Sequence, residues 1–151
     1  LKDIYTGKIT NWKELGGADA NIVVVSRDTS SGTYETWEEM VMKKAKVMPK
    51  ALLQASNGAV EQVVAKNPNA IGYVGIGHLD ESVKGVAVDG MVPSQEGAAD
   101  GSYTVTRLLY MNTKGEPEGL TKLFVDYIYS EDGKGFISQS GYIPYTPDNR
   151  K

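Results

Sequence analysis

The amino-acid sequence predicts an α/β fold with a mainly parallel sheet flanked by helices. Residues 21–26 form a continuous β-branched apolar run, which is typical of a strand covered on both faces. A helical pattern follows at residues 33–47, and a second apolar run stands at residues 70–75 after another helical pattern. Strands therefore alternate with helices, and this order favours parallel strands joined by helical crossovers.

The first part of the chain contributes four expected elements. Residues 2–5 and 11–15 are expected to form short helices on either side of a Thr-Gly-Lys turn. The strand at 21–26 follows, and a polar loop then leads into a long helix from about residue 33 to residue 47. Acidic residues early in this helix and lysines late in it suit the helix dipole. Its apolar residues recur at roughly helical spacing: Tyr34, Trp37, Val41 and Met48.

The middle of the chain predicts a second crossover. Ser56-Asn57-Gly58 is a helix start, and the helix is expected to end at the Asn-Pro-Asn sequence of residues 67–69. Residues 70–75 then predict a short buried strand. Residues 83–88 alternate weakly and are expected to form another strand, whereas 93–101 is rich in small residues and is expected to be a surface loop.

The last third predicts a longer strand and two helices. Residues 103–111 have the pattern of a strand. Pro117 is expected in the first turn of the next helix, because proline suits that position. Ser130, followed by two acidic residues, is expected to cap a final helix that runs to about Ser138. The helix after Pro117 carries apolar residues at helical spacing: Leu120, Leu123, Phe124, Tyr127 and Ile128.

Composition bounds the function classes. The chain has 151 residues, 40% hydrophobic and 23% charged, which is globular and large enough to bury a core. A formal net charge of -3 argues against a nucleic-acid surface, which needs clustered Lys and Arg. The absence of Cys excludes disulfides, thiolate metal sites and cysteine nucleophiles. No apolar stretch approaches the roughly 18 residues that a transmembrane helix needs.

The polar loop after the first strand concentrates groups that bind anions. Arg27 offers a planar charged fork, and Ser31, Gly32 and Thr33 precede the helix, where backbone N–H groups lack intrahelical partners. Gly32 permits a close approach of the backbone to a ligand. Ordinary helix capping explains the same Ser-Gly-Thr sequence, so spacing alone leaves capping and oxyanion binding open.

Three further polar residues are additional candidates for ligand contact: Ser30, Ser56 and Asn57. Asp28 is expected instead to form an ion pair with Arg27 or a local turn. His78 is the only histidine, which argues against a catalytic triad or a multi-histidine metal site. The sequence offers no convincing nucleophile–base pair. Its adjacent carboxylates, Glu38-Glu39 and Glu131-Asp132, lie in helix first turns or on solvated faces and do not support a glycosidase-like pair, so we predict no catalytic residue, no metal site and no cofactor.

The ordered set of motifs resembles the phosphate-binding proteins of ABC phosphate importers, which have the type II periplasmic-binding-protein fold. The central motif is Arg27-x-x-x-Ser31-Gly32-Thr33, and the matching segments around it are residues 7–12, 70–75, 109–113 and 141–144. The resemblance covers nearly the whole chain. It implies that residues 1–108 form the second lobe of a two-lobed protein, and that 109–151 supply the return crossing and C-terminal helices. The first lobe is expected to be absent from this chain.

The resemblance also implies a ligand set. The second-lobe contacts of the family fall on Arg27, Ser31, the N–H of Gly32, and Thr33, and all four residue types match. The remaining contacts in the family come from the first lobe and include an Asp that accepts a hydrogen bond from protonated phosphate. Discrimination against sulfate is therefore not located in this sequence.

By this resemblance we expect an extracytoplasmic solute-binding protein that captures inorganic phosphate and delivers it to a membrane permease, without catalysis. It would lie in the periplasm or on the cell surface as an anchored lipoprotein. Two alternatives stay open: an enzyme acting on a phosphorylated substrate, and a sensor or binding domain for another tetrahedral oxyanion such as sulfate or molybdate. The surface that a first lobe would cover is expected to be apolar and to favour self-association. Affinity, organism and oligomeric state do not follow from the sequence.

Overall fold

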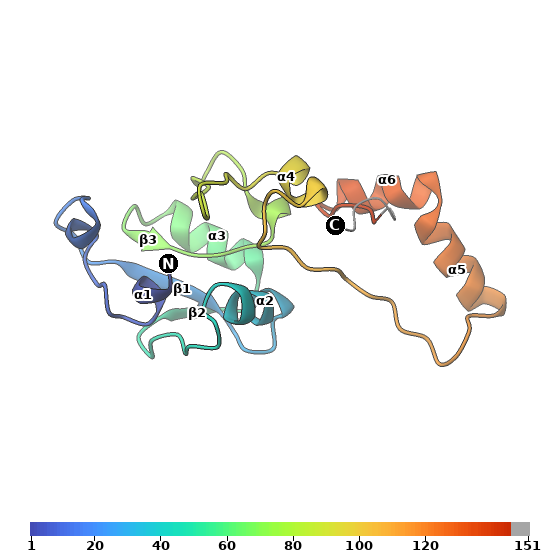
Figure 1. The fold of residues 1–151 in the computed structure, drawn as a ribbon, viewed down its shortest axis with the longest axis horizontal. Helices are drawn as coiled ribbons and strands as arrows, with labels where there is room; N and C mark the ends of the chain where they lie inside the picture. Colours follow the sequence, from blue (N-terminus) through green and yellow to red (C-terminus); the bar gives the residue numbers. More distant parts are fainter. Residues whose placement is uncertain (146–151) are drawn as a thin grey trace. The chain divides into compact units, whose positions relative to one another are not determined.

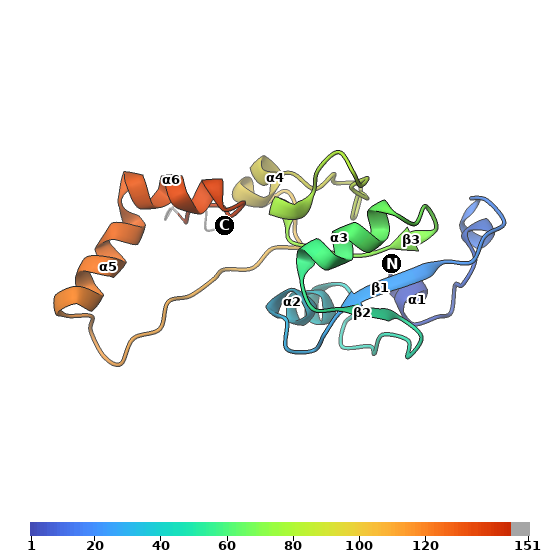
Figure 2. The same ribbon diagram turned by 180° about the vertical axis from the view of Figure 1, so that it is seen from behind.

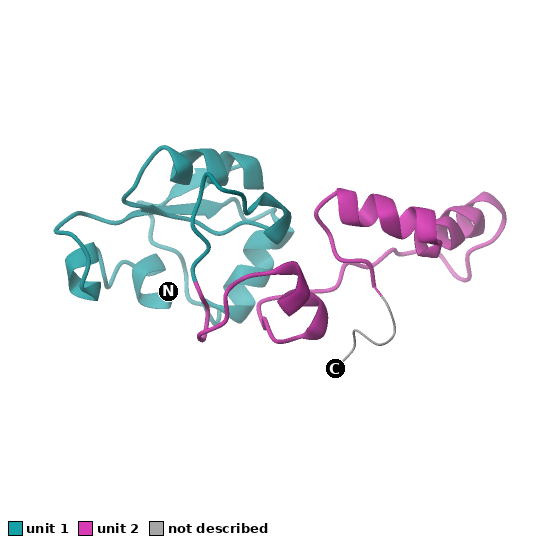
Figure 3. Ribbon diagram, turned by 90° about the horizontal axis from the view of Figure 1, so that it is seen from above, with its two compact units in different colours: residues 1–86 teal, residues 87–151 magenta. Residues whose placement is uncertain are grey.

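The computed structural model describes residues 1–145, and the chain divides into two compact units. Unit 1 comprises Leu1–Val86, and unit 2 begins at Ala87 (Figure 3). The expected division at residue 108 concerns the lobes of a longer protein, and it stays a prediction. The candidate anion site lies in unit 1, so that unit is described first.

Unit 1 is built on a three-stranded parallel sheet. The strands are β1 (Val23–Arg27), β2 (Leu52–Gln54) and β3 (Ala70–Ile71), in the order β2-β1-β3. The central strand β1 holds the apolar run that predicted it, and it pairs in parallel with both β2 and β3, which confirms the expected sheet. β2 is an additional strand that the sequence did not predict. Its leucines are exposed, so it lacks the apolar burial that marks a central strand.

Helices cover both faces of this sheet. α3 (Asn57–Ala65) lies on one side of β1, and α1 (Lys2–Tyr5) and α2 (Gly32–Met40) lie on the other (Figures 1 and 2). Two 3-10 turns complete the unit, η1 (Trp12–Leu15) and η2 (Ile76–His78). Coverage on both faces explains why β1 is continuously apolar rather than alternating.

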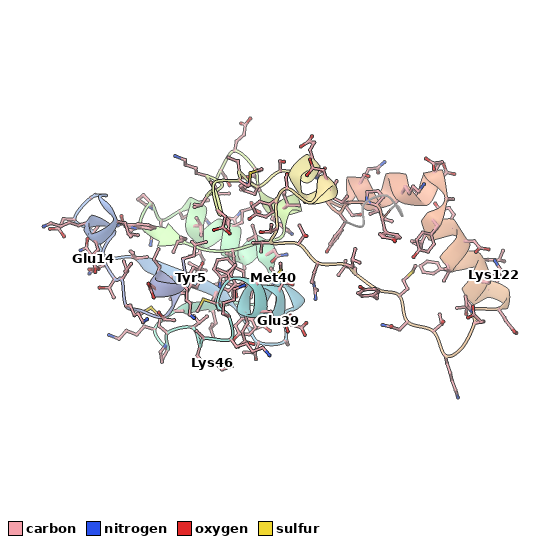
Figure 4. All side chains as sticks on the ribbon, viewed as in Figure 1. Tyr5, Glu14, Glu39, Met40, Lys46 and Lys122 are labelled. Carbon is pink, nitrogen blue, oxygen red and sulfur yellow. The ribbon has the colours of Figure 1, made fainter. Side chains whose placement is uncertain are left out.

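An aromatic cluster fills the space between β1 and the helices α1 and α2. Tyr5, which is labelled in Figure 4, is fully buried, and its ring lies 4.9 Å from that of Trp37. Trp37 stacks on Tyr73, with centroids 4.5 Å apart and planes 8° from parallel. Val24 and Met42 join the same cluster. This cluster is the core of unit 1.

The helix α2 is shorter than the sequence predicted. It ends at Met40 rather than near residue 47, and Lys43 and Lys44 have left-handed backbone conformations, with φ of 50° and 63°. Met42 is fully buried immediately after the helix. Burial of this side chain takes the chain out of the helix, which local helical spacing does not predict.

Three expected strands are shorter or absent. β3 covers only Ala70–Ile71 of the expected 70–75. The expected strands at 83–88 and 103–111 do not form, and an isolated bridge between Val88 and Met91 is the pairing found there. A strand needs a partner edge, and apart from that bridge no strand within residues 1–145 pairs with these segments. Their alternating patterns therefore gave the wrong prediction.

Unit 2 contains three helices among its described residues. The first is α4 (Gln95–Asp100), which lies where a surface loop was expected; Ser94 caps its start through a hydrogen bond from Gly97 N. The others are α5 (Gly119–Tyr129) and α6 (Glu131–Gln139). Ser130 caps α6 as predicted, with Gly133 N donating to its Oγ at 3.2 Å. Pro117 lies two residues before α5 rather than inside its first turn.

Candidate anion-binding site

The site lies at the carboxyl end of the parallel sheet. Arg27 is the last residue of β1, and the sheet register sets it beside Gln54, the last residue of β2. The connections that lead to α2 and to α3 therefore leave the same edge. This is the edge at which open α/β sheets bind ligands.

Arg27 is held at this edge by three hydrogen bonds from its guanidinium. Nε donates to the carbonyl of Gln54 at 3.2 Å, Nη2 to the carbonyl of Ala55 at 3.1 Å, and Nη1 to Asn57 Oδ1 at 2.7 Å. The side chain is only 11% exposed. A guanidinium has five N–H donors, so one donor on each Nη is left over after these bonds. Two donors of a fixed, charged group thus stand available for an anion.

The backbone of Arg27 is anchored to the core through Tyr73. Arg27 N donates to the Tyr73 hydroxyl at 3.1 Å, and that hydroxyl lies 2.9 Å from Ser26 Oγ. Burial raises the pKa of Tyr73, which keeps the phenol neutral and able both to donate and to accept. Because Tyr73 stacks on Trp37 in the aromatic cluster, the position of Arg27 is tied to the core of unit 1.

Ser31 is the N-cap of α2. Its Oγ accepts hydrogen bonds from Thr33 N at 3.2 Å and Tyr34 N at 3.3 Å. Neither bond uses the hydroxyl hydrogen of Ser31, which therefore can still donate to a ligand. Capping and oxyanion binding, the two interpretations that the sequence left open, are compatible at this residue.

Gly32 and Thr33 present the remaining donors of the α2 N-terminus. The N–H of Gly32 has no acceptor among residues 1–145, and the hydroxyl of Thr33 has no hydrogen-bond partner there either. Gly32 is not in the left-handed backbone region. What glycine contributes here is the absence of a side chain beside the free N–H, and not an unusual φ.

Asp28 and Ser30 form a local turn inside the loop, as expected for Asp28. Asp28 Oδ1 accepts hydrogen bonds from Ser30 N at 3.1 Å and from Ser30 Oγ, and its Oδ2 lies 3.9 Å from Arg27 Nη2. The hydroxyl of Ser30 is the largest cause of a lowered Asp28 pKa, and Arg27 lowers it further. The hydroxyl of Ser30 thus donates its hydrogen to Asp28. Contact between Ser30 and a ligand stays a prediction.

Ser56 and Asn57 begin α3 and take different roles. Ser56 is the N-cap, and its Oγ accepts a hydrogen bond from Ala59 N at 3.1 Å. Asn57 is the first residue of the helix, and its side-chain oxygen accepts a hydrogen bond from Arg27. Ligand contact by either residue stays a prediction.

Three contributors to the site were not found by sequence reasoning. They are the carbonyls of Gln54 and Ala55 and the hydroxyl of Tyr73, all of which bind Arg27. Tyr73 lies in the segment 70–75, which is part of the resemblance, and its place in that motif could have indicated a role beside Arg27. Nothing in the sequence of residues 52–55 indicated that the carbonyls of Gln54 and Ala55 would face Arg27.

Other chemistry is sparse. Within residues 1–145 no three His, Cys, Asp or Glu side chains gather to hold a metal ion. None of the helices described has the length and apolar character needed to cross a membrane. His78 Nδ1 lies 3.4 Å from Glu61 Oε2, so it contacts a residue of α3.

Comparison with known proteins identifies the family. The model of the PBP superfamily domain matches residues 1–132. The chain belongs to the PBP superfamily. The chain is 40% identical over 148 residues to the phosphate-binding protein PstS of Bacillus subtilis, covering 97% of this chain and 49% of that protein. It is 31% identical to PstS of Borreliella burgdorferi, covering 95% of this chain and 56% of that protein.

Solved structures of the superfamily have the same fold. A phosphate ABC transporter substrate-binding protein from Clostridium perfringens, solved with bound phosphate, matches 96% of this chain with a TM-score of 0.81 and 38% identity. An ABC-type phosphate transport receptor from Vibrio cholerae matches 94% with a TM-score of 0.76 and 36% identity. The chain spans 60% of each of these two structures and about half the length of the two PstS proteins.

Proposed function

We propose that this chain provides the Arg27 side of an inorganic-phosphate site in an extracytoplasmic solute-binding protein of an ABC importer. The observation that carries the proposal is the fixed guanidinium of Arg27, with one unused donor on each Nη, at the end of β1 and before the loop that leads to the free N–H of Gly32. The names of the PstS relatives and the bound phosphate in the Clostridium perfringens structure support it.

Phosphate is bound by hydrogen bonds and released unchanged in this proposal. The two free donors of Arg27 reach two oxygens, and the Gly32 N–H and the hydroxyls of Ser31 and Thr33 reach the others. The positive end of the α2 dipole adds to the attraction. No bond to phosphate is made or broken, so the role is binding and not catalysis.

The remaining donors come from outside this chain in our proposal. Residues 1–108 act as the second lobe, 109–151 as the return crossing and C-terminal helices, and a first lobe closes over the phosphate. The loaded protein then delivers phosphate to the membrane permease of the importer. The approximately half-length coverage of the PstS relatives supports this arrangement.

This chain by itself is expected to discriminate weakly between phosphate and sulfate. All four proposed contacts donate hydrogen bonds, which both anions accept. Selection of phosphate needs an acceptor for its proton. Asp28, the carboxylate of this loop, has Oδ1 engaged by Ser30 and Oδ2 facing Arg27. The selective acceptor is therefore assigned to the first lobe.

The test is a titration of the 151-residue chain with inorganic phosphate, followed by ¹H–¹⁵N correlation spectra. We expect saturable shifts of the Gly32 amide and of the Arg27 side-chain N–H signals, with sulfate giving a similar response and chloride at equal ionic strength giving none. Arg27→Ala is expected to abolish the saturable shift of Gly32. A wild-type chain whose Gly32 and Arg27 signals do not respond to phosphate would overturn the proposal.

A further inference from the structure

The side-chain oxygen of Asn57 faces Arg27. Asn57 Oδ1 accepts from Arg27 Nη1 at 2.7 Å, the shortest of the three guanidinium hydrogen bonds. Because a guanidinium only donates, Asn57 must present its oxygen and not its NH2 group. We propose that Asn57 is a positioning residue, which orients the guanidinium of Arg27 toward the anion; this inference rests on the proposed function.

The three bonds to Arg27 are not equivalent. Main-chain carbonyls hold Nε and Nη2, and they remain whatever side chains occupy positions 54 and 55. Nη1 has Asn57 as its hydrogen-bond partner, and within residues 1–145 no other acceptor binds it. Orientation of Nη1 therefore depends on a single side chain. Asn57 also stands at the first position of α3, where the cap formed by Ser56 fixes its backbone.

The amide is the type of acceptor that suits an anion site. A carboxylate in the same place would orient Arg27 equally well, but its negative charge would repel the incoming anion. An amide oxygen is neutral, so it fixes the guanidinium without cancelling its charge. The carboxylate of Asp28 lies near the guanidinium, but the 3.9 Å between its Oδ2 and Arg27 Nη2 is too long for a hydrogen bond. Asn57 thus orients the guanidinium of Arg27 without neutralising its positive charge.

The first arm of the test uses the chain without ligand and measures exchange of the Arg27 side-chain N–H protons with water. Asn57→Ala is expected to speed this exchange, because Nη1 is released and the guanidinium gains freedom to rotate. Asn57→Asp is expected to keep the exchange slow. The matched control is Asn67→Ala, two residues beyond the C-terminal end of α3, where Oδ1 accepts from Asn69 N at 3.0 Å; it is expected to leave Arg27 unchanged.

The second arm measures binding of inorganic phosphate. Asn57→Ala is expected to weaken it about threefold to tenfold, less than Arg27→Ala, because the two carbonyl bonds persist. Asn57→Asp is expected to weaken it at least as much, although it retains the orientation of Arg27. Asn67→Ala is expected to bind normally.

The two arms separate the inference from the proposed function. Unchanged Arg27 exchange in Asn57→Ala would overturn the positioning role, whatever phosphate does. Wild-type affinity in Asn57→Asp would overturn the argument from charge. A wild-type chain that ignores phosphate would overturn the proposed function and, with it, the binding role of Asn57, even if Arg27 exchange responded as expected.

Discussion

At the scale of single residues, Arg27 is a charged side chain that is only 11% exposed to water. Arg27→Ala should weaken phosphate binding at least about tenfold to a hundredfold, since one charge-assisted hydrogen bond contributes about 1.5–3 kcal/mol. Arg27→Lys should recover only part, because an ammonium lacks the planar fork that binds two oxygens. Phosphate titration of the three proteins checks this, and wild-type affinity in Arg27→Ala would rule out the assigned role.

Asp28 provides a prediction about pH. Hydrogen bonds from Ser30, and then the charge of Arg27, lower the pKa of Asp28 in the folded chain. A lowered folded pKa means that the turn stabilises the fold above the unfolded pKa of about 3.9, and that this contribution is lost as pH falls through the folded pKa. The loop should therefore be insensitive to pH near neutrality.

The measurement is an NMR titration of the Asp28 carboxyl carbon. Its midpoint should lie below that of an ordinary Asp, and Ser30→Ala should raise it toward the ordinary value. A midpoint at or above the ordinary value in the wild-type chain would mean that the Asp28–Ser30 turn does not form.

At the scale of secondary-structure elements, Gly72 determines how closely α3 packs on the sheet. A Cβ at this position would stand 2.6 Å from Val60 Cγ1 and 3.0 Å from Val64 Cγ2. Valine side chains are stiff, so the helix itself would have to move. Gly72→Ala should therefore destabilise unit 1 by about 1–3 kcal/mol, in the range of overpacked cores.

Gly58, which lies in α3 itself, gives a matched control for the substitution of Gly72. A Cβ there meets no atom within 4 Å. Gly58→Ala should raise helix stability by up to about 1 kcal/mol, because Ala is the better helix former. Urea denaturation of both variants tests the pair, and equal midpoints would show that α3 is not packed against Gly72 as described.

At the scale of the whole molecule, the chain offers phosphate donors from one loop and one helix start. An anion held there keeps its outer face in water of high dielectric constant, which weakens each hydrogen bond. Several charge-assisted bonds would be missing relative to a closed two-lobed site, so we predict affinity of roughly millimolar order. Calorimetry that gave submicromolar affinity for the monomeric chain would contradict this and would require further ligands within these 151 residues.

Unit 2 carries the apolar surface from which we expect self-association. Leu120 is 84% exposed on α5, and Leu123 and Phe124 are largely exposed beside it. Such a surface is unusual for a monomer in water. Sedimentation velocity should show association that rises with concentration and falls in the double variant Leu120→Ser, Phe124→Ser. A wild-type chain that stays monomeric at all concentrations would show that this surface does not drive association.

The site was predicted in part. Spacing placed Arg27 at a strand end and Ser31 at a helix start, because both positions follow from local periodicity and capping chemistry. The sequence did not predict that β2 would lie beside β1, so the carbonyls that hold Arg27 were missed. The early end of α2 was missed for the same kind of reason, since it depends on where Met42 is buried.

By itself, the sequence determined the parallel α/β class, the strand β1 and the capped starts of α2, α3 and α6. The strand and the helix starts depend on contacts between residues near one another in the chain, and the parallel class follows from the alternating order of strands and helices. Only the tertiary structure decided which groups bind the guanidinium and the backbone N–H of Arg27. Gln54, Asn57 and Tyr73 come from segments 27 to 46 residues away, and pairing of β1 with β2 and β3 brings them together. Long-range strand pairing has no local signature, because its free energy is gained only when distant segments meet.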